Sequence, residues 1–149
     1  MIALNLPKFE VKVSVQNGKP VIFDRLRRKY VIITPEEWVR QHFINFLLTE
    51  KQYPENLIAN EIGIKLNNTQ KRCDTVVYDR LLVPLVIIEY KAPSIDITMN
   101  VFDQIVRYNM VLKAKYLIVS NGLQHFCCKI NYDKGDYSFL EEIPAYSKL

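Results

Sequence analysis

Two carboxylates and a lysine mark the part of this sequence that could do chemistry. Asp74 opens one predicted strand, and Glu89 and Lys91 close the next, which is the most hydrophobic strand of the chain. Charged side chains rarely end such a strand for packing reasons. Because side chains alternate along a strand, we expect Glu89 and Lys91 on one side and Tyr90 on the other.

These three side chains suit metal-assisted hydrolysis of a phosphodiester. If the two strands are antiparallel neighbours, the start of one lies beside the end of the other, so Asp74 approaches Glu89 within reach of one cation. Two carboxylates, a backbone carbonyl and waters form the oxygen-rich site that Mg²⁺ or Mn²⁺ prefers. The metal would polarise the phosphate and activate a bound water, while Lys91 would position that nucleophile or stabilise the transition state.

The residues before this site predict an N-terminal hairpin and a helix. Residues 9–16 alternate, Asn17-Gly18 supplies a tight turn, and residues 20–33 continue extended, so residues 1–33 are expected to form a hairpin appendage. Thr34 as N-cap, followed by Pro35 and then Glu37, predicts a helix. Its other markers are apolar residues near helical spacing and polar residues between them, up to about Glu50: Trp38, Phe43, Phe46 and Leu47, with Arg40 and Gln41 polar.

Three strands, a helix and two strands are expected after that. Residues 57–66 and 73–80 read as strands around a polar turn, and residues 81–91 as a central strand buried on both faces. A helix from about Thr98 carries one stripe of Val101, Ile105, Tyr108 and Leu112, and two strands flank an Asn121-Gly122 turn. Residues 136–149 read as a weakly specified tail. A strand, a helix and a further strand favour a right-handed crossover, so the prediction is an α/β fold with a mixed central sheet flanked by helices.

The site motif resembles the D-x(n)-ExK signature of the PD-(D/E)xK nuclease superfamily. Asp74 is followed by fourteen residues and then by Glu89-Tyr90-Lys91, with Cys73 where the family name has proline. Gln104 and Tyr108 on the next predicted helix resemble the QxxxY element of the nuclease domain in type I restriction endonuclease motor subunits and RecB-like nucleases. In order and spacing, most of the chain is similar to the N-terminal domain of the type I restriction enzyme R subunit.

This resemblance implies a restriction-endonuclease-like fold, with a nuclease core at residues 34–130 of a single domain, and a Mg²⁺- or Mn²⁺-dependent deoxyribonuclease. Asp74 and Glu89 would bind the metal and Lys91 would serve the nucleophile. Gln104 would orient the substrate or the attacking water, supported by Tyr108.

Further carboxylates have two interpretations each. In the resembled family a first-helix glutamate can help to bind metal, which makes Glu37 an additional ligand candidate, although a capping box with Thr34 also explains it. Glu36 would replace Glu37 if the register differs by one residue. Glu61 lies in an alternating strand, where it pairs with Lys65, faces solvent or supports the site from behind.

The charge of the chain favours an anionic partner. Twenty Lys and Arg against sixteen Asp and Glu give a net charge of +4. If the fold is right, Lys71, Arg72 and Arg107 lie near the catalytic edge and bind phosphates without reading bases. The expected partner is DNA, together with a helicase or methyltransferase and a second copy of the chain for double-strand cleavage. A run of charges is usually a solvated face, and other basic residues precede the first helix: Arg25, Arg27, Arg28 and Lys29.

The cysteines and histidines are assigned no chemistry. Cys73, Cys127 and Cys128 do not form a disulfide framework, and the adjacent pair points to opposite faces of a strand, which disfavours zinc and suggests a reducing cytoplasm. His42 and His125 are interpreted as packing or surface residues. No apolar stretch reaches the ~18 residues of a membrane span.

Two competing functions remain open. The chain could be a nucleic-acid-binding or assembly module that kept the nuclease fold without turnover. It could also be an RNA- or nucleotide-directed hydrolase on the same scaffold, since a fold does not determine its substrate.

Overall fold

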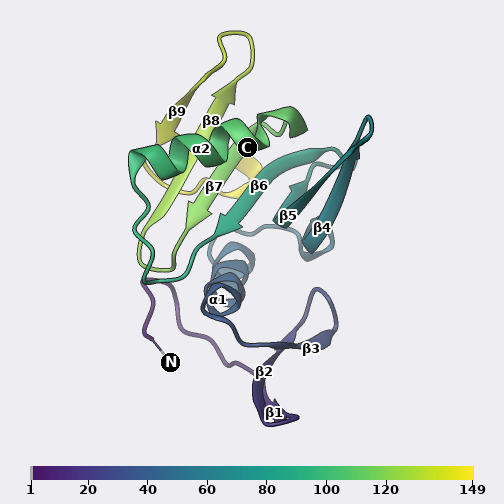
Figure 1. The fold of residues 1–149 in the computed structure, drawn as a ribbon, viewed down its shortest axis with the longest axis vertical. Coiled ribbons are helices and arrows are strands. Elements are labelled where there is room, and N and C mark those ends of the chain that lie inside the picture. Colours follow the sequence, from purple (N-terminus) through teal and green to yellow (C-terminus); the bar gives the residue numbers. More distant parts are fainter. Residues whose placement is uncertain (1) are drawn as a thin grey trace.

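The computed structural model describes residues 2–149, which form two β-sheets with helix α1 between them (Figure 1). The N-terminal sheet is antiparallel, in the order β1-β2-β3, and the larger sheet has the order β4-β5-β6-β7-β8-β9. Among the described residues of the larger sheet, β6 and β7 pair in parallel and all other neighbours are antiparallel, so this sheet is mixed, as predicted. The strands are β1 Val13–Gln16, β2 Lys19–Asp24, β3 Lys29–Ile32, β4 Ile58–Leu66, β5 Thr69–Tyr78, β6 Pro84–Tyr90, β7 Tyr116–Ser120, β8 His125–Asn131 and β9 Asp136–Leu140.

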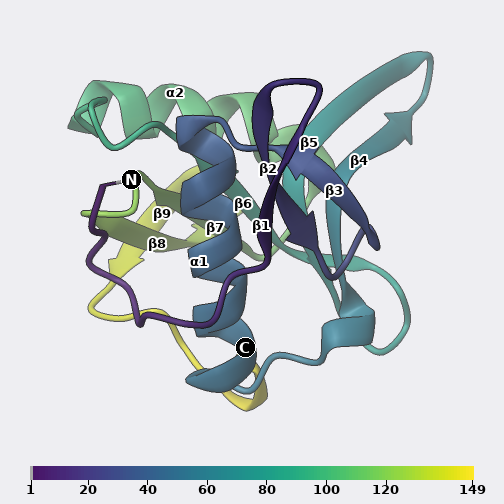
Figure 2. The same ribbon diagram turned by 90° about the horizontal axis from the view of Figure 1, so that it is seen from below.

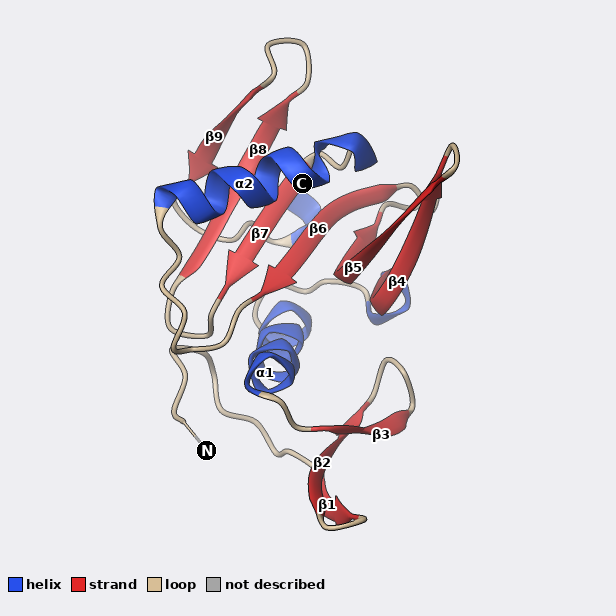
Figure 3. Ribbon diagram, in the orientation of Figure 1, coloured by secondary structure: helices blue, strands red, loops and turns tan. Residues whose placement is uncertain are grey.

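Two helices cover opposite faces of the larger sheet (Figure 3). They are α1 (Pro35–Thr49) and α2 (Met99–Asn109), and short 3₁₀ turns follow at Glu55–Leu57, Met110–Leu112 and Tyr146–Lys148. Each face has its own apolar core. The α1 face buries Val39, Phe43, Leu47, Val86 and Ile88, and the α2 face buries Phe102, Ile105, Val106, Ile87 and Leu117.

The N-terminal prediction of a two-stranded hairpin is wrong by one strand. Asn17 and Gly18 have positive φ angles of 51° and 75°, which confirms the tight turn. The expected second strand is interrupted after Asp24, because the Asp24 carboxylate accepts hydrogen bonds from the backbone N–H groups of Leu26 and Arg27. Such a side-chain cap closes a turn, and β3 then pairs back onto β2.

Helix α1 begins as predicted, with the Thr34 hydroxyl accepting a hydrogen bond from the Glu37 N–H at 3.0 Å. Its polar residues Arg40 and Gln41 are nevertheless buried. Figure 2 shows α1 in front of the larger sheet, with the chain before β1 running around it. Since α1 is covered on two sides, polar side chains that would face solvent on a one-sided helix become part of the interior.

Asp74 does not open a strand, contrary to the prediction. The turn between β4 and β5 contains only Asn67 and Asn68, because Leu66 already pairs with Thr69, so most of the polar segment expected as a turn belongs to β5. Asp74 lies in the middle of β5. Asp74 does lie at the end of the pairing between β5 and β6, because the ladder of these two strands begins at the next residue, with Thr75 opposite Ile88.

Two further predictions need correction. Tyr108 was expected on the apolar stripe of α2 but is 56% exposed, and the buried face of this helix is formed by Phe102, Ile105, Val106 and Asn109. The expected tail contains β9, which pairs with β8, and Phe139 of β9 packs 4.8 Å from Phe102 between ring centroids. Cys127 and Cys128 point into opposite cores, as predicted. No helix among residues 2–149 is long and apolar enough to cross a membrane.

Candidate active site

Asp74 and Glu89 meet where the β5–β6 ladder stops. The register that pairs Thr75 with Ile88 brings the next residue on each strand, Asp74 and Glu89, alongside each other. The Asp74 carboxylate also accepts a hydrogen bond from the Tyr90 N–H, with 3.0 Å between Oδ2 and N. This bond ties the Asp74 side chain to the end of the strand that carries Glu89.

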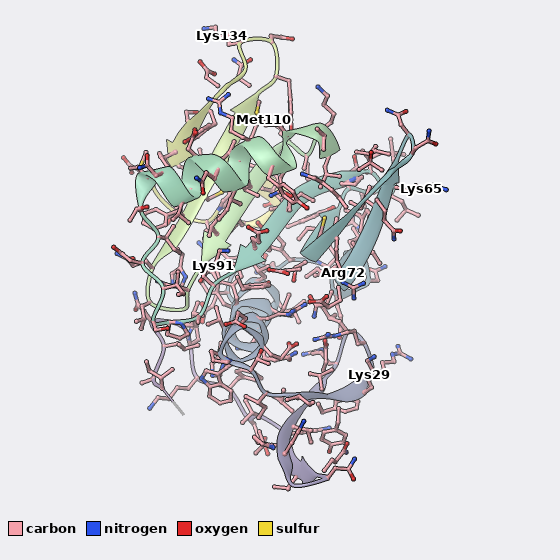
Figure 4. All side chains as sticks on the ribbon, in the orientation of Figure 1. Lys29, Lys65, Arg72, Lys91, Met110 and Lys134 are labelled. Atoms are coloured by element: carbon pink, nitrogen blue, oxygen red, sulfur yellow. The ribbon has the colours of Figure 1, made fainter. Side chains whose placement is uncertain are left out.

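Lys91 completes the predicted trio in one pocket. The Lys91 backbone N–H donates to the Ser120 carbonyl at 2.9 Å, which holds the end of β6 against β7. Figure 4 shows Lys91 at the end of β6, close to α1. A pocket of about 490 Å³ opens there, and its walls come from β3, α1, β4, β5 and β6: Ile32, Thr34, Glu36, Glu37, Arg40, Glu61, Asp74, Glu89, Tyr90 and Lys91.

The carboxylates of Asp74 and Glu89 lose protons less readily in this pocket than exposed carboxylates do. Burial raises the pKa of Asp74 above its ordinary value, against the opposing effect of the Tyr90 N–H and of Arg40. Burial also raises the pKa of Glu89, and the negative charge of Asp74 raises it further. Two neighbouring carboxylates that are poorly solvated and repel each other favour a bound cation.

The donors of the pocket match the preferences of a magnesium ion. Mg²⁺ in proteins usually keeps several waters and binds through one or two carboxylates, and Asp74 with Glu89 supplies that number. No group of three or more His, Cys, Asp or Glu side chains arranged to hold a metal is found among residues 2–149. The pair therefore fits a hydrated, hard divalent cation better than a zinc ion enclosed by four protein ligands.

Glu37 lines the pocket, but its carboxylate is already occupied by basic partners. Its Oε1 accepts from Arg27 Nη2 at 2.6 Å, and its Oε2 accepts from Gln41 Nε2 at 2.9 Å and lies 3.3 Å from Arg40 Nε. The Glu36 side chain, which was the alternative, is exposed at the rim of the pocket. Glu37 thus differs from Asp74 and Glu89, whose carboxylate oxygens have no arginine at hydrogen-bonding distance among the described residues.

Arg40 is a residue of this site that the sequence did not reveal. Its guanidinium donates to the Asp74 carbonyl oxygen at 2.8 Å and to Glu61 Oε1 at 2.6 Å, and Arg72 donates to the other oxygen of Glu61 at 2.9 Å. Burial raises the pKa of Glu61, but hydrogen bonds from both arginines outweigh it, so the net shift is downward. A polar residue between apolar ones on a helix normally indicates a solvent-facing side, so no sequence signal distinguished Arg40.

The residues predicted to contact substrate lie outside the pocket wall. Lys71 Nζ lies 3.0 Å from the centroid of the Tyr108 ring, and burial lowers the pKa of Lys71 while Cys73 and Glu89 raise it. Gln104 is exposed on α2, and Arg107 forms a 3.6 Å ion pair with Asp103. Arg72, by contrast, reaches the rim through Glu61.

The histidines have structural partners. His42 Nδ1 lies 2.9 Å from the Trp38 carbonyl, and His125 bridges the Ser120 hydroxyl and the Asn5 carbonyl, at 2.7 Å and 2.9 Å. Burial lowers the pKa of both rings, so they are neutral at physiological pH. Neither residue lines the pocket of Asp74 and Glu89.

Known proteins resemble this chain in sequence profile and in fold. In fold, the fragment structure of an HsdR subunit of a type I restriction enzyme from Vibrio vulnificus YJ016 matches 76% of the chain with a TM-score of 0.51 and 19% identity. A cryo-EM structure of a DrdV–DNA complex matches 77% of it with a TM-score of 0.45 and 15% identity. This chain spans 24% and 11% of the lengths of those two chains. No curated protein matches it.

The sequence comparison identifies the family. The profile of the family described as "Type I restriction enzyme R protein N terminus" matches residues 35–144, which extend from the first residue of α1 past β9 and include every charged residue of the pocket. Because this match takes in well over half of the sequence, the chain belongs to the family of type I restriction enzyme R protein N-terminal domains.

Proposed function

We propose that this domain is a Mg²⁺- or Mn²⁺-dependent nuclease that hydrolyses phosphodiester bonds of DNA. The observation that carries the proposal is the pocket in which Asp74, Glu89 and Lys91 lie together at the edge of the β5–β6 ladder. These two half-buried carboxylates both have raised pKa values, and a bound cation would compensate their charge.

In the proposed reaction Asp74 and Glu89 would hold the metal, and their own contacts keep them in place. A bound Mg²⁺ would supply a polarised phosphate oxygen and a more acidic water. The ammonium of Lys91 lies in the same pocket, where it would hold the attacking water by a hydrogen bond or balance negative charge that develops on the phosphate. Arg40 would keep Asp74 in position through its hydrogen bond to the Asp74 carbonyl oxygen.

We propose DNA as the substrate because the family is that of a restriction enzyme subunit, and because Arg40 and Lys91 line the pocket while Arg72 pairs with Glu61 of its wall. Figure 4 shows Lys29, Lys65 and Arg72 on the same side of the molecule in that view. Phosphate contacts from Lys71, Arg72 and Arg107 would bring affinity without base recognition. Gln104 and Tyr108 would contact a substrate that extends from the pocket over α2.

Restriction is the proposed biological role, in which this domain would act together with other chains or domains. A helicase or a methyltransferase would be the partner that brings the domain to DNA. A single site cuts one strand at a time, so double-strand cleavage would require a second copy of the domain or two successive nicks.

A plasmid-nicking assay tests the proposal. Wild-type protein with Mg²⁺ or Mn²⁺ should convert supercoiled plasmid to the open circular form, and a chelator should stop it. Lys91→Ala should lower the rate by about 10²-fold or more, as expected when a charge-stabilising group is removed. Lys134→Ala is the matched control, because Lys134 lies on the far turn between β8 and β9 (Figure 4).

Three outcomes of this assay separate the alternatives. Equal rates for Lys91→Ala and wild type would remove Lys91 from the mechanism. Wild-type protein that binds DNA in a salt-dependent manner but never cleaves it would identify a binding or assembly module. RNA and mononucleotides assayed in parallel would reveal a hydrolase of another substrate class.

A further inference from the structure

On the basis of the proposed nuclease function, we infer that the N-terminal sheet positions Asp74 of the active site through a series of contacts, which we call the relay. In the relay Arg27 forms an ion pair with Glu37, Glu37 forms one with Arg40, and Arg40 donates a hydrogen bond to the Asp74 carbonyl oxygen. Arg27 and Arg40 are positioning residues in this scheme. They touch no reacting atom and act through the backbone of Asp74.

The first part of this relay is the turn between β2 and β3. Asp24 is 1% exposed, and its carboxylate accepts hydrogen bonds from the Arg27 backbone N–H and the Arg27 Nε, and from Asn60 Nδ2 at 3.1 Å. These contacts fix the Arg27 side chain along most of its length. The terminal nitrogen Nη2 is thereby directed at Glu37, 2.6 Å from Oε1.

Glu37 and Arg40 form the second part, one turn apart on α1. Glu37 Oε2 lies 3.3 Å from Arg40 Nε, without the geometry of a hydrogen bond, and Nε has no hydrogen-bond partner among the described residues. The contact between these two residues is therefore mainly electrostatic. Arg27 neutralises Glu37 from the other side, which leaves the guanidinium of Arg40 free to bond elsewhere with its two terminal nitrogens.

The two terminal nitrogens of Arg40 donate hydrogen bonds to the part of the larger sheet where the backbone of β4 is irregular. Glu61 has a φ of 54° in the middle of β4, and it lies between the pairs Asn60–Thr75 and Ile62–Cys73, so it faces Asp74 across the ladder. A left-handed conformation of a non-glycine residue in a strand persists only where the surroundings hold it. Arg40 bonds the Glu61 side chain and the Asp74 carbonyl at the same time.

The consequence for the proposed metal site is a fixed direction for Asp74. The Asp74 carbonyl is held by Arg40 and its carboxylate by the Tyr90 N–H, so backbone and side chain are both anchored. Without Arg27, the charge of Glu37 is unbalanced and draws the Arg40 guanidinium away from Asp74 and Glu61. Residue 27 precedes the segment matched by the family profile, residues 35–144, so the relay adds a part to the site that the match does not include.

Amide hydrogen exchange tests this relay without any metal. The Tyr90 N–H donates to Asp74 Oδ2, so its exchange rate reports directly on the position of the Asp74 side chain. Arg27→Met and Arg40→Met should each raise that rate by about tenfold or more, with core amides such as that of Ile118 unchanged. Arg25→Met is the matched control, because Arg25 is in the same turn but pairs with Glu55 on the surface, where their side chains are 57% and 45% exposed.

Mn²⁺ affinity, measured by titration calorimetry on the same variants, is the second readout. Loss of a residue that supports a metal ligand typically weakens affinity by about 10- to 100-fold, and we expect this for Arg27→Met and Arg40→Met but not for Arg25→Met. If Arg40→Met unfolds, Arg27→Lys, which keeps the charge, should recover most of the protection lost in Arg27→Met.

The two proposals fail in different ways. A folded Arg27→Met protein whose Tyr90 amide exchanges as in wild type would overturn the relay, whatever the wild type cleaves. If Arg27→Met raises the exchange rate of the Tyr90 amide but wild-type protein binds no Mn²⁺, the nuclease proposal is overturned and the relay is left as a structural device.

Discussion

The carboxylate of Asp74 accepts a hydrogen bond from the backbone N–H of Tyr90 on the neighbouring strand, with Oδ2 and N 3.0 Å apart. Asp74 therefore completes the ladder with its side chain at the point where the backbone pairing of β5 and β6 ends. One oxygen of Asp74 is used in this way and the other remains for the pocket. The relationship also explains why Asp74 and Glu89 stay close together although both lose solvation.

The first prediction concerns the stability cost of Glu89. Its pKa is raised by burial and by Asp74, so the folded protein binds this proton more tightly than the unfolded chain does, and the ionised carboxylate destabilises the fold at neutral pH. Glu89→Gln should therefore raise the melting temperature of metal-free protein, by about 2–4 °C for each ~1 kcal/mol gained. Calorimetry in a chelator measures this, with Glu142→Gln as the exposed control. A lower melting temperature for Glu89→Gln would contradict it.

A second prediction is the pH dependence of metal binding. The pKa values of Asp74 and Glu89 both lie above their ordinary values of 3.8 and 4.5, so protons compete with a cation at higher pH than they would at exposed carboxylates. Mn²⁺ affinity should be greatest at neutral pH and should fall as the pH decreases through the raised values. Calorimetric titrations at a series of pH values check this. If the Mn²⁺ affinity stays constant until the pH reaches the ordinary pKa values of the two carboxylates, burial does not raise their pKa values in the way described.

Asp24 provides the opposite case, because its pKa is lowered. Burial raises this pKa, but hydrogen bonds from Arg27 and Asn60 outweigh it, so the ionised form stabilises the fold. That stability is present above the unfolded value of 3.8 and is lost as the pH falls through the lowered folded value. Asp24→Asn should cost about 3 kcal/mol at neutral pH, since it leaves the half-buried Arg27 short of a partner.

Urea unfolding is the measurement for that substitution. Asp133→Asn is a matched control on an exposed turn and should change the unfolding free energy by less than about 0.5 kcal/mol. An Asp24→Asn protein as stable as wild type would mean that the buried ion pair adds nothing to the fold.

The last prediction concerns Arg72, which pairs with Glu61 of the pocket wall. The side chain of Arg72 is 70% exposed and reaches the pocket only through Glu61. If it contacts a phosphate, Arg72→Ala should weaken DNA binding equally for all sequences and should reduce the slope of log affinity against log salt by about 1. Fluorescence anisotropy with two unrelated duplexes at several salt concentrations measures this. An unchanged slope would place the DNA elsewhere, and Lys134→Ala should leave the slope unchanged in any case.

Local patterns were sufficient for the parts of the fold that depend on near neighbours. The Thr34 cap and the Asn17-Gly18 turn each involve residues only a few positions apart, and both are found in the structure. The mixed sheet with helices on both faces follows from the order of such elements. The third N-terminal strand was missed because a side chain, that of Asp24, closes a turn inside a segment that otherwise reads as extended.

By itself, the sequence determined which residue types stand at the end of the central strand, and hence that Asp74, Glu89 and Lys91 were worth bringing together. Only the tertiary structure decided that Glu37 is bound by arginines, that Arg40 is buried beside Asp74 and that Tyr108 faces solvent. The physical reason is that these contacts join residues far apart in the sequence. Arg40 and Asp74 are separated by 34 residues and interact because a second sheet covers the outer side of α1, and no local periodicity records on which side a helix will be covered.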